Sequence, residues 1–225
     1  MGRAQASRKD ISMGEILLVR HGQANSGATT EADYDRLSDL GHRQARWLGE
    51  WLQAHDAQFD HILSGTLRRQ RETVTGMGFT ADEDSRLNEL DYYTLSAALT
   101  AVKGVPHPGP DGFADHMPQV FAAWQAAEIE GAEPYTQFES RVRDLLDEAA
   151  VPGRRLLCVT SGGVIGMVLR HLLGLDLTAM SNVMLPIYNT SLHRIRVTPD
   201  RTILAGYNAT PHLDAPARSA ARTQY

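Results

Sequence analysis

Short apolar runs separated by polar segments predict a series of β-strands along the chain. The runs cover residues 16–19, 59–63, 155–159, 191–197 and 202–207. The first run, Ile16 to Val19, is apolar throughout, as expected of a parallel strand buried on both faces. The last two runs are joined only by residues 198–201, and this short link predicts an antiparallel hairpin at one edge of the sheet.

Apolar residues at helical spacing predict helices between these strands. Ser38 is placed to cap a helix whose apolar face includes Leu48 and Leu52, and further helices are expected over 66–76 and 134–150. Another helix starts at Gly162 and ends near Gly174. Strands that alternate with helices predict an α/β fold, a three-layer α/β/α sandwich with a mainly parallel mixed sheet.

The 225 residues fit a single domain, which we place at 14–213. Residues 91–131 interrupt the strand–helix alternation with several prolines and glycines, followed by an amphipathic stretch. We interpret this segment as an insertion over the carboxyl ends of the strands, where substrate selectivity is set. Polar composition predicts a disordered tail over 1–13, and an Ala-, Arg- and Ser-rich composition predicts a flexible tail over 214–225.

Charge and composition exclude several classes of protein. A net charge of −5 argues against a nucleic-acid partner. No apolar run reaches the roughly 18 residues that would span a membrane. The single cysteine, Cys158, fits a reducing compartment, so a cytoplasmic location is expected. The nine histidines lack metal-ligand spacing, and no metal site is predicted. The oligomeric state stays open, a homodimer included.

Candidate chemistry begins directly after the first predicted strand, at Arg20-His21-Gly22. Ligands of open α/β sheets gather at the carboxyl ends of the strands. Arg20 offers a planar set of donors that suits phosphate, and the ring of His21 can act as a nucleophile. Gly22 lets the backbone turn sharply, so that a bound group can approach it closely.

Together with two later segments, this motif resembles the histidine phosphatase (phosphoglycerate mutase-like) superfamily. Segment 63–73 resembles the family's phosphate-binding helix start, and 86–90, Arg-Leu-Asn-Glu-Leu, resembles the stretch that carries the general acid. The resemblance implies that His21 is the nucleophile and Glu89 the proton donor, with Arg20 and Arg69 as phosphoryl ligands. At a helix start, backbone donors and the helix dipole would support Arg69. Arg68 and Arg71 are alternatives to Arg69, and Asp91 is an alternative to Glu89.

The chain departs from the family pattern after the strand at 155–159. Ser161 stands where the family has a second histidine, although Gly162 and the following helix start are kept. A serine donates one neutral hydrogen bond, about 1 kcal/mol against 1.5–3 for a charged donor, so roughly tenfold slower chemistry is expected. The loop histidines His107, His116 and His212 are alternative sources of the missing donor.

Another departure lies just after the first motif, where Gly27 replaces an asparagine ligand that many family members carry. Asn25 or Ser26 is the expected substitute, and Asn25 with Gln23 completes the predicted substrate-binding residues. Asn189 resembles a family asparagine before a late strand, and we favour a strand cap as its role.

The sequence therefore predicts a phosphoric monoester hydrolase that acts on a small phosphorylated molecule through a phosphohistidine, without a cofactor. Its activity is expected to be reduced. The alternatives are a phospho-ligand-binding protein of little or no activity on the same fold, and a phosphomutase. A serine hydrolase based on Ser161 is disfavoured, because its surroundings do not form a nucleophile elbow.

Overall fold

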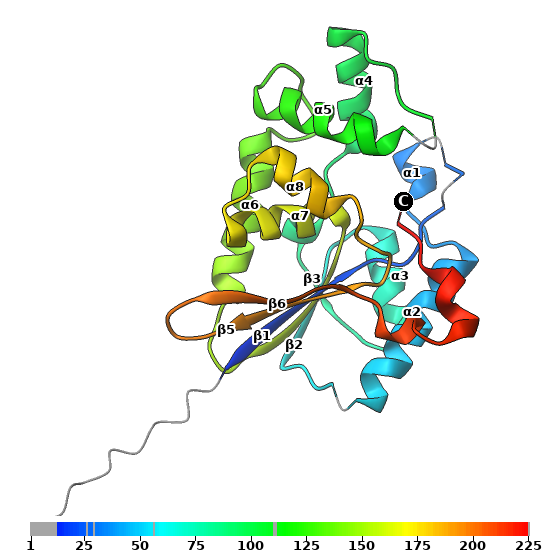
Figure 1. The fold of residues 1–225 in the computed structure, drawn as a ribbon, viewed down its shortest axis with the longest axis vertical. Helices are drawn as coiled ribbons and strands as arrows, with labels where there is room; N and C mark the ends of the chain where they lie inside the picture. The colour runs from blue at the N-terminus through cyan, green and yellow to red at the C-terminus, as the bar shows by residue number, and fades with distance from the viewer. Residues whose placement is uncertain (1–12, 26, 29, 56, 110–111, 225) are drawn as a thin grey trace, which may run out of the picture.

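The computed structural model describes residues 13–25, 27–28, 30–55, 57–109 and 112–224 (Figure 1). In this part of the chain six strands form one sheet, in the order β3-β2-β4-β1-β5-β6. Strands β1, β2, β3 and β4 run parallel, and β5 and β6 extend the sheet in antiparallel fashion. The strands are β1 (Gly14–Arg20), β2 (His61–Ser64), β3 (Asp82–Glu83), β4 (Arg155–Thr160), β5 (Leu192–Val197) and β6 (Thr202–Ala209). The predicted mixed α/β sheet is confirmed.

Helices cover both faces of the sheet (Figure 1). Those of the described residues are α1 (Glu31–Tyr34), α2 (Asp39–Ala54), α3 (Arg68–Gly76), α4 (Tyr92–Lys103), α5 (Phe113–Gln125), α6 (Tyr135–Ala149), α7 (Gly162–Leu173) and α8 (Leu177–Met184). Leu17 and Val19 of β1 pack with α2 and α3 on one face, whereas Ile16 and Leu18 face the larger core. Alternate residues of β1 therefore belong to opposite cores, which is why its run is apolar throughout.

Local signals set the ends of the predicted helices. The Ser38 hydroxyl accepts a hydrogen bond from the backbone N–H of Gly41 at 3.1 Å, which caps α2 as expected. Gly174 ends α7 in the left-handed conformation, with a φ of 65°. The described residues of segment 91–131 include α4 and α5, which lie beyond the carboxyl end of the sheet (Figure 1).

The predicted flexible tail at 214–225 is corrected by the structure over 214–224. A 3-10 helix covers Pro216–Ala221, and Ala221 is buried. Gln44, a fully buried residue of α2, donates hydrogen bonds to the Ala221 carbonyl at 2.7 Å and to the Thr223 hydroxyl at 3.0 Å. Composition alone gave no sign of the tail's packing, because its partner is a buried amide far away in the sequence. The tail predicted over 1–13 lies, except for Met13, outside the described residues.

We expect the Thr223 hydroxyl to stabilise the fold. It also donates to Asn189 Oδ1 at 2.8 Å, and Asn189 Nδ2 in turn donates to the His21 carbonyl at 3.1 Å. Thr223→Val keeps the shape of the side chain but removes the two hydrogen bonds of its hydroxyl, with Gln44 and with Asn189. It should therefore lower the free energy of unfolding by about 1–3 kcal/mol. Urea unfolding measures this, with Ser219→Ala on the exposed part of the same segment as the control. An equal effect of the two substitutions would contradict the role.

No helix in the described part of the chain is both long enough and apolar enough to cross a membrane.

Candidate active site

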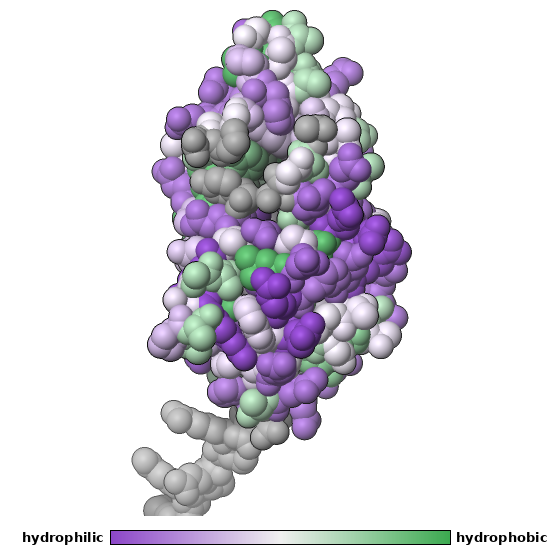
Figure 2. All heavy atoms as spheres, turned by 90° about the vertical axis from the view of Figure 1, so that its right-hand side faces the viewer, coloured by the Kyte–Doolittle hydropathy of each residue, from purple (hydrophilic) through white to green (hydrophobic). Residues whose placement is uncertain are grey.

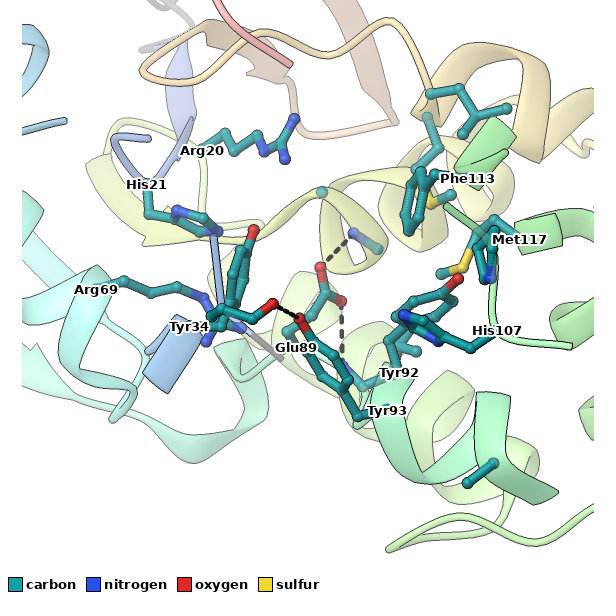
Figure 3. Close-up of a pocket in the computed structure, with 18 of the residues that line it drawn as sticks. Arg20, His21, Tyr34, Arg69, Glu89, Tyr92, Tyr93, His107, Phe113 and Met117 are labelled. Carbon is teal, nitrogen blue, oxygen red and sulfur yellow. Dashed lines mark hydrogen bonds between the residues drawn. The ribbon is translucent and has the colours of Figure 1, made fainter. Parts of the chain in front are cut away.

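A cavity of about 930 Å³ opens at the carboxyl ends of β1, β2 and β4, between the sheet and the α4–α5 segment (Figure 3). Its sheet side carries the predicted charged groups, and its far side carries aromatic and apolar side chains. The described lining residues are Arg20, His21, Ala28, Tyr34, Arg69, Glu89, Leu90, Tyr92, Tyr93, Ala97, His107, Pro108, Gly109, Phe113, Met117, Gly162, Gly163, Met184 and Leu185.

His21 follows the last residue of β1 and is only 2% exposed. Its Nδ1 lies 2.8 Å from the carbonyl oxygen of Gly22, which can only accept. Nδ1 therefore carries the proton of the neutral ring, and Nε2 keeps its lone pair. Burial, with Arg69 and Arg20 nearby, holds the pKa of His21 well below its ordinary 6.5. The ring is therefore neutral at pH 7, the state in which it is nucleophilic.

Gly22 is required by close packing behind this turn. A Cβ at Gly22 would lie 2.7 Å from the carbonyl oxygen of Gly41, at the start of α2. The sequence predicted a close approach at Gly22, and the group that approaches is the backbone of α2.

Arg20 and Arg69 lie on either side of His21 (Figure 3). Arg20 Nη1 donates to the Ile187 carbonyl, and its buried Nε has no hydrogen-bond partner among the described residues. Burial lowers the pKa of Arg20, and the Tyr34 phenol and Glu89 oppose this effect. An arginine stays charged even so, and it directs donors into the cavity.

Arg69 stands in the first turn of α3 and is 1% exposed. Asp35 Oδ1 accepts hydrogen bonds from both its backbone N–H and its Nη1, each at 3.1 Å. The Tyr34 ring packs against the guanidinium, with 4.9 Å from Cζ to the ring centroid. Asp35 thus fixes Arg69 and caps α3. Among the predicted alternatives, Arg68 forms an exposed ion pair with Glu72 instead.

Glu89 lies across the cavity from His21 (Figure 3). Its Oε2 accepts a hydrogen bond from the Gly163 N–H at 2.8 Å, and Oε1 accepts one from the Leu90 N–H at 3.1 Å. Burial raises the pKa of Glu89 above its ordinary 4.5, while these bonds and the two arginines oppose the rise. A Cβ at Gly163 would lie 2.3 Å from Oε1, so only glycine leaves room for the carboxyl group.

The start of α7 reaches the cavity through Gly162 and Gly163, whereas Ser161 is fully buried and is not one of the lining residues. The Ser161 hydroxyl accepts a hydrogen bond from Gln70 Nε2 at 2.8 Å. Gln70 is itself buried and also donates to the Leu87 carbonyl. The positive end of the α7 dipole therefore faces the cavity even though the serine side chain lies behind the wall.

Gln23 and Asn25, both predicted to bind substrate, are not among the lining residues. Gln23 Oε1 accepts from the Ser38 hydroxyl at 2.7 Å, which holds the side chain at the start of α2. Asn25 Nδ2 donates to the Asp33 carbonyl at 3.1 Å, in α1. Both amides are engaged in joining the loop after β1 to the neighbouring helices.

Of the three histidines predicted in loops, His107 alone is among the described lining residues, whereas His116 lies in α5 and His212 in a 3-10 helix. Its Nδ1 lies 2.8 Å from the Ser96 hydroxyl, and its ring stacks on Tyr93. His116 pairs with the Tyr92 hydroxyl, and His212 pairs with Thr190.

Sequence reasoning did not identify the aromatic part of the cavity. Tyr34 comes from the short helix α1, Tyr92 and Tyr93 begin α4, and Phe113 and Met117 lie on α5 (Figure 3). The only signal was that an insertion over the site was expected to hold selectivity residues.

Within the described residues, no group of three or more His, Cys, Asp or Glu side chains is placed to hold a metal ion. What the site offers instead is a pair of guanidinium groups, a helix start, a neutral imidazole and a carboxyl group with a raised pKa, all around one space. Such a set can bind a tetrahedral dianion and supply both a nucleophile and a proton donor.

The sequence matches one protein-family model, and solved structures share the fold. The model of the histidine phosphatase superfamily (branch 1) matches residues 16–210. No curated protein matches the sequence. Similar solved structures include a phosphoserine phosphatase variant from Entamoeba histolytica, with 17% identity, a TM-score of 0.64, and coverage of 89% of this chain and 99% of that one. A Bacillus anthracis phosphoglycerate mutase has 18% identity, a TM-score of 0.62, and coverage of 90% and 96%. A mycobacterial glucosyl-3-phosphoglycerate phosphatase has 24% identity, a TM-score of 0.61, and coverage of 87% and 98%.

Proposed function

The chain belongs to the histidine phosphatase superfamily (branch 1), and from that premise we propose that it is a metal-independent phosphoric monoester hydrolase that forms a phosphohistidine on His21. One observation carries the proposal. The neutral His21 ring, with its Nδ1 proton held by the Gly22 carbonyl, lies between two buried arginines in a cavity that also contains Glu89.

In the first step, the Nε2 lone pair of His21 attacks the phosphorus atom. An N–P bond forms, the P–O ester bond breaks with its electron pair on the leaving oxygen, and that oxygen takes the Glu89 proton. In the second step, a water molecule gives a proton back to Glu89 and attacks the phosphorus atom. The N–P bond then breaks, which returns the lone pair to Nε2 and releases inorganic phosphate.

Arg20 and Arg69 stabilise the charge on the phosphoryl oxygens in both steps, and the start of α7 adds its dipole. Asp35 keeps Arg69 in place, so little reorganisation is needed when the phosphoryl group is transferred. In this proposal Gln23 and Asn25 shape the loop that carries His21. The same pair of arginines would also bind the phosphate of a ligand that is not hydrolysed.

Ser161 tests how far the missing histidine weakens the site. We expect Ser161→Ala to lower kcat by about tenfold at most, because the hydroxyl lies behind the cavity wall, where its one neutral hydrogen bond is with Gln70. Steady-state phosphate release measures this. A loss of 100-fold or more would make the hydroxyl a direct ligand of the transition state. An unchanged kcat in Ser161→Ala together with a severe loss of kcat in His107→Ala would instead assign the missing donor to His107.

The position of Ser161 behind the cavity wall favours one rival, a phospho-ligand-binding protein with little turnover. Purified protein incubated with a panel of phosphomonoesters separates the two functions. Release of inorganic phosphate supports the hydrolase. Phosphate binding by calorimetry without release from any ester would support the binding protein. Phosphate transfer to a second hydroxyl of the substrate would indicate a mutase.

A further inference from the structure

Beyond the phosphoryl-binding end, the cavity is walled by aromatic rings and apolar side chains. The ring centroids of Tyr92 and Phe113 lie 5.1 Å apart at 67°, and those of Tyr93 and His107 lie 5.6 Å apart at 20°. Met117 and Met184, both buried, complete this wall from α5 and α8. Edge-to-face and stacked rings of this kind accept a further flat or apolar group.

Three polar side-chain atoms of this wall already have hydrogen-bond partners. The Tyr92 hydroxyl pairs with His116 at 2.9 Å, and the Tyr93 hydroxyl donates to the Ala28 carbonyl at 3.3 Å. His107 Nδ1 pairs with the Ser96 hydroxyl. A polyhydroxylated group would lose its hydrogen bonds to water here and would regain few from the wall.

The wall also lacks a second cationic site. Arg20 and Arg69 are the only arginines among the described lining residues, which contain no lysine, and both are placed at the phosphoryl end. A carboxylate on the leaving group would therefore be buried beside rings and methionines, with no lysine or further arginine among the described lining residues to pair with it, which is costly.

We propose that the substrates are phosphomonoesters of uncharged, largely apolar alcohols, aromatic ones included, and that Tyr93, Phe113 and Met117 select the leaving group. This inference rests on the proposed function for its site. Burial of one phenyl group against this wall should favour such a substrate on the order of 30-fold over one that leaves the wall empty.

The test compares kcat/KM for 2-phenylethyl phosphate, methyl phosphate and 3-phosphoglycerate, all esters of primary or simple alkyl alcohols. We expect kcat/KM for 2-phenylethyl phosphate to exceed kcat/KM for each of the other two esters by about 30-fold or more. Equal values, or a preference for 3-phosphoglycerate, would overturn the inference while leaving the hydrolase in place.

Phe113→Ala should reduce the ratio of kcat/KM for 2-phenylethyl phosphate to kcat/KM for methyl phosphate about tenfold. Phe59→Ala is the matched control, because Phe59 is also half-buried but packs on the opposite face of the sheet, and it should leave the ratio unchanged. Equal loss on both esters in Phe113→Ala would mean that Phe113 supports the fold rather than selects the substrate.

Calorimetric binding of 2-phenylethylphosphonate and methylphosphonate separates this inference from the proposed function. If no ester is hydrolysed but the phenylethyl compound binds at least tenfold more tightly, the hydrolase fails and the apolar selectivity stands. If both phosphonates bind equally, the selectivity fails whatever the turnover.

Discussion

Replacement of His21 by alanine is expected to lower phosphatase turnover by about 10⁴-fold or more and to abolish a covalent phosphoenzyme. The ring supplies the only route by which the proposed mechanism divides phosphoryl transfer into two steps. Its Nε2 keeps a lone pair because Nδ1 donates to the Gly22 carbonyl, and its depressed pKa keeps that lone pair available at neutral pH.

Rapid acid and base quenching with ³²P-labelled ester, followed by peptide mapping, measures the intermediate. The label should be acid-labile, base-stable and located on His21. His55→Ala is the control, since His55 Nδ1 also lies 2.8 Å from a carbonyl oxygen, that of Trp51, yet the residue is exposed. Label on a serine or aspartate, or normal turnover in His21→Ala, would refute the mechanism.

The sequence predicted the fold well where one face of an element is apolar. β1, α2 and α7 match the predicted segments closely because burial and capping act on residues near one another in the chain. β3 was missed, since its two residues are both exposed and show no apolar pattern. α1 and α8 were also missed, because each is too short for a helical period to stand out.

The site could be predicted only in part, for a related reason. Arg20, His21, Arg69 and Glu89 were predicted from local motifs, and the structure brings all of them to one cavity. Pairing across the chain is not visible in a motif. Asp35 on Arg69 and Gln70 on Ser161 each arise from segments that meet only once the sheet has formed.

Gln23 and Asn25 also show that residue type alone does not reveal which partner a side chain binds. Their amides suit a phosphate as well as they suit the backbone, so residue type alone left both uses open. In the structure, the start of α2 and the carbonyl of Asp33 occupy them. Whether either one also contacts a bound substrate stays a prediction.

Glu89→Gln is expected to slow hydrolysis of alkyl phosphates by about 10²–10⁴-fold and to affect aryl phosphates with acidic leaving groups far less. An alkoxide is a poor leaving group unless it is protonated, and a glutamine amide cannot supply that proton. Glutamine has nearly the same shape, and its amide oxygen can still accept the Gly163 hydrogen bond, while the bond from the Leu90 N–H is lost. Equal loss on both classes of ester would show a structural role for Glu89.

The pH dependence of turnover provides a second test of Glu89 as the proton donor. Glu89 must be protonated and its pKa lies above the ordinary 4.5, so alkyl-ester turnover should fall as pH rises through that pKa. His21 must be neutral and its pKa lies well below 6.5, so turnover should persist into acid before it falls. Glu89→Gln should remove the loss of turnover at high pH and leave the loss of turnover at low pH. Asp91→Asn is the control, because Asp91 caps α4 by accepting hydrogen bonds from the N–H and the hydroxyl of Thr94, and asparagine can still accept the N–H bond. If Asp91→Asn instead removed the loss of turnover at high pH, Asp91 would be the proton donor. Glu89 would then serve only to position the start of α7 through its bond with Gly163.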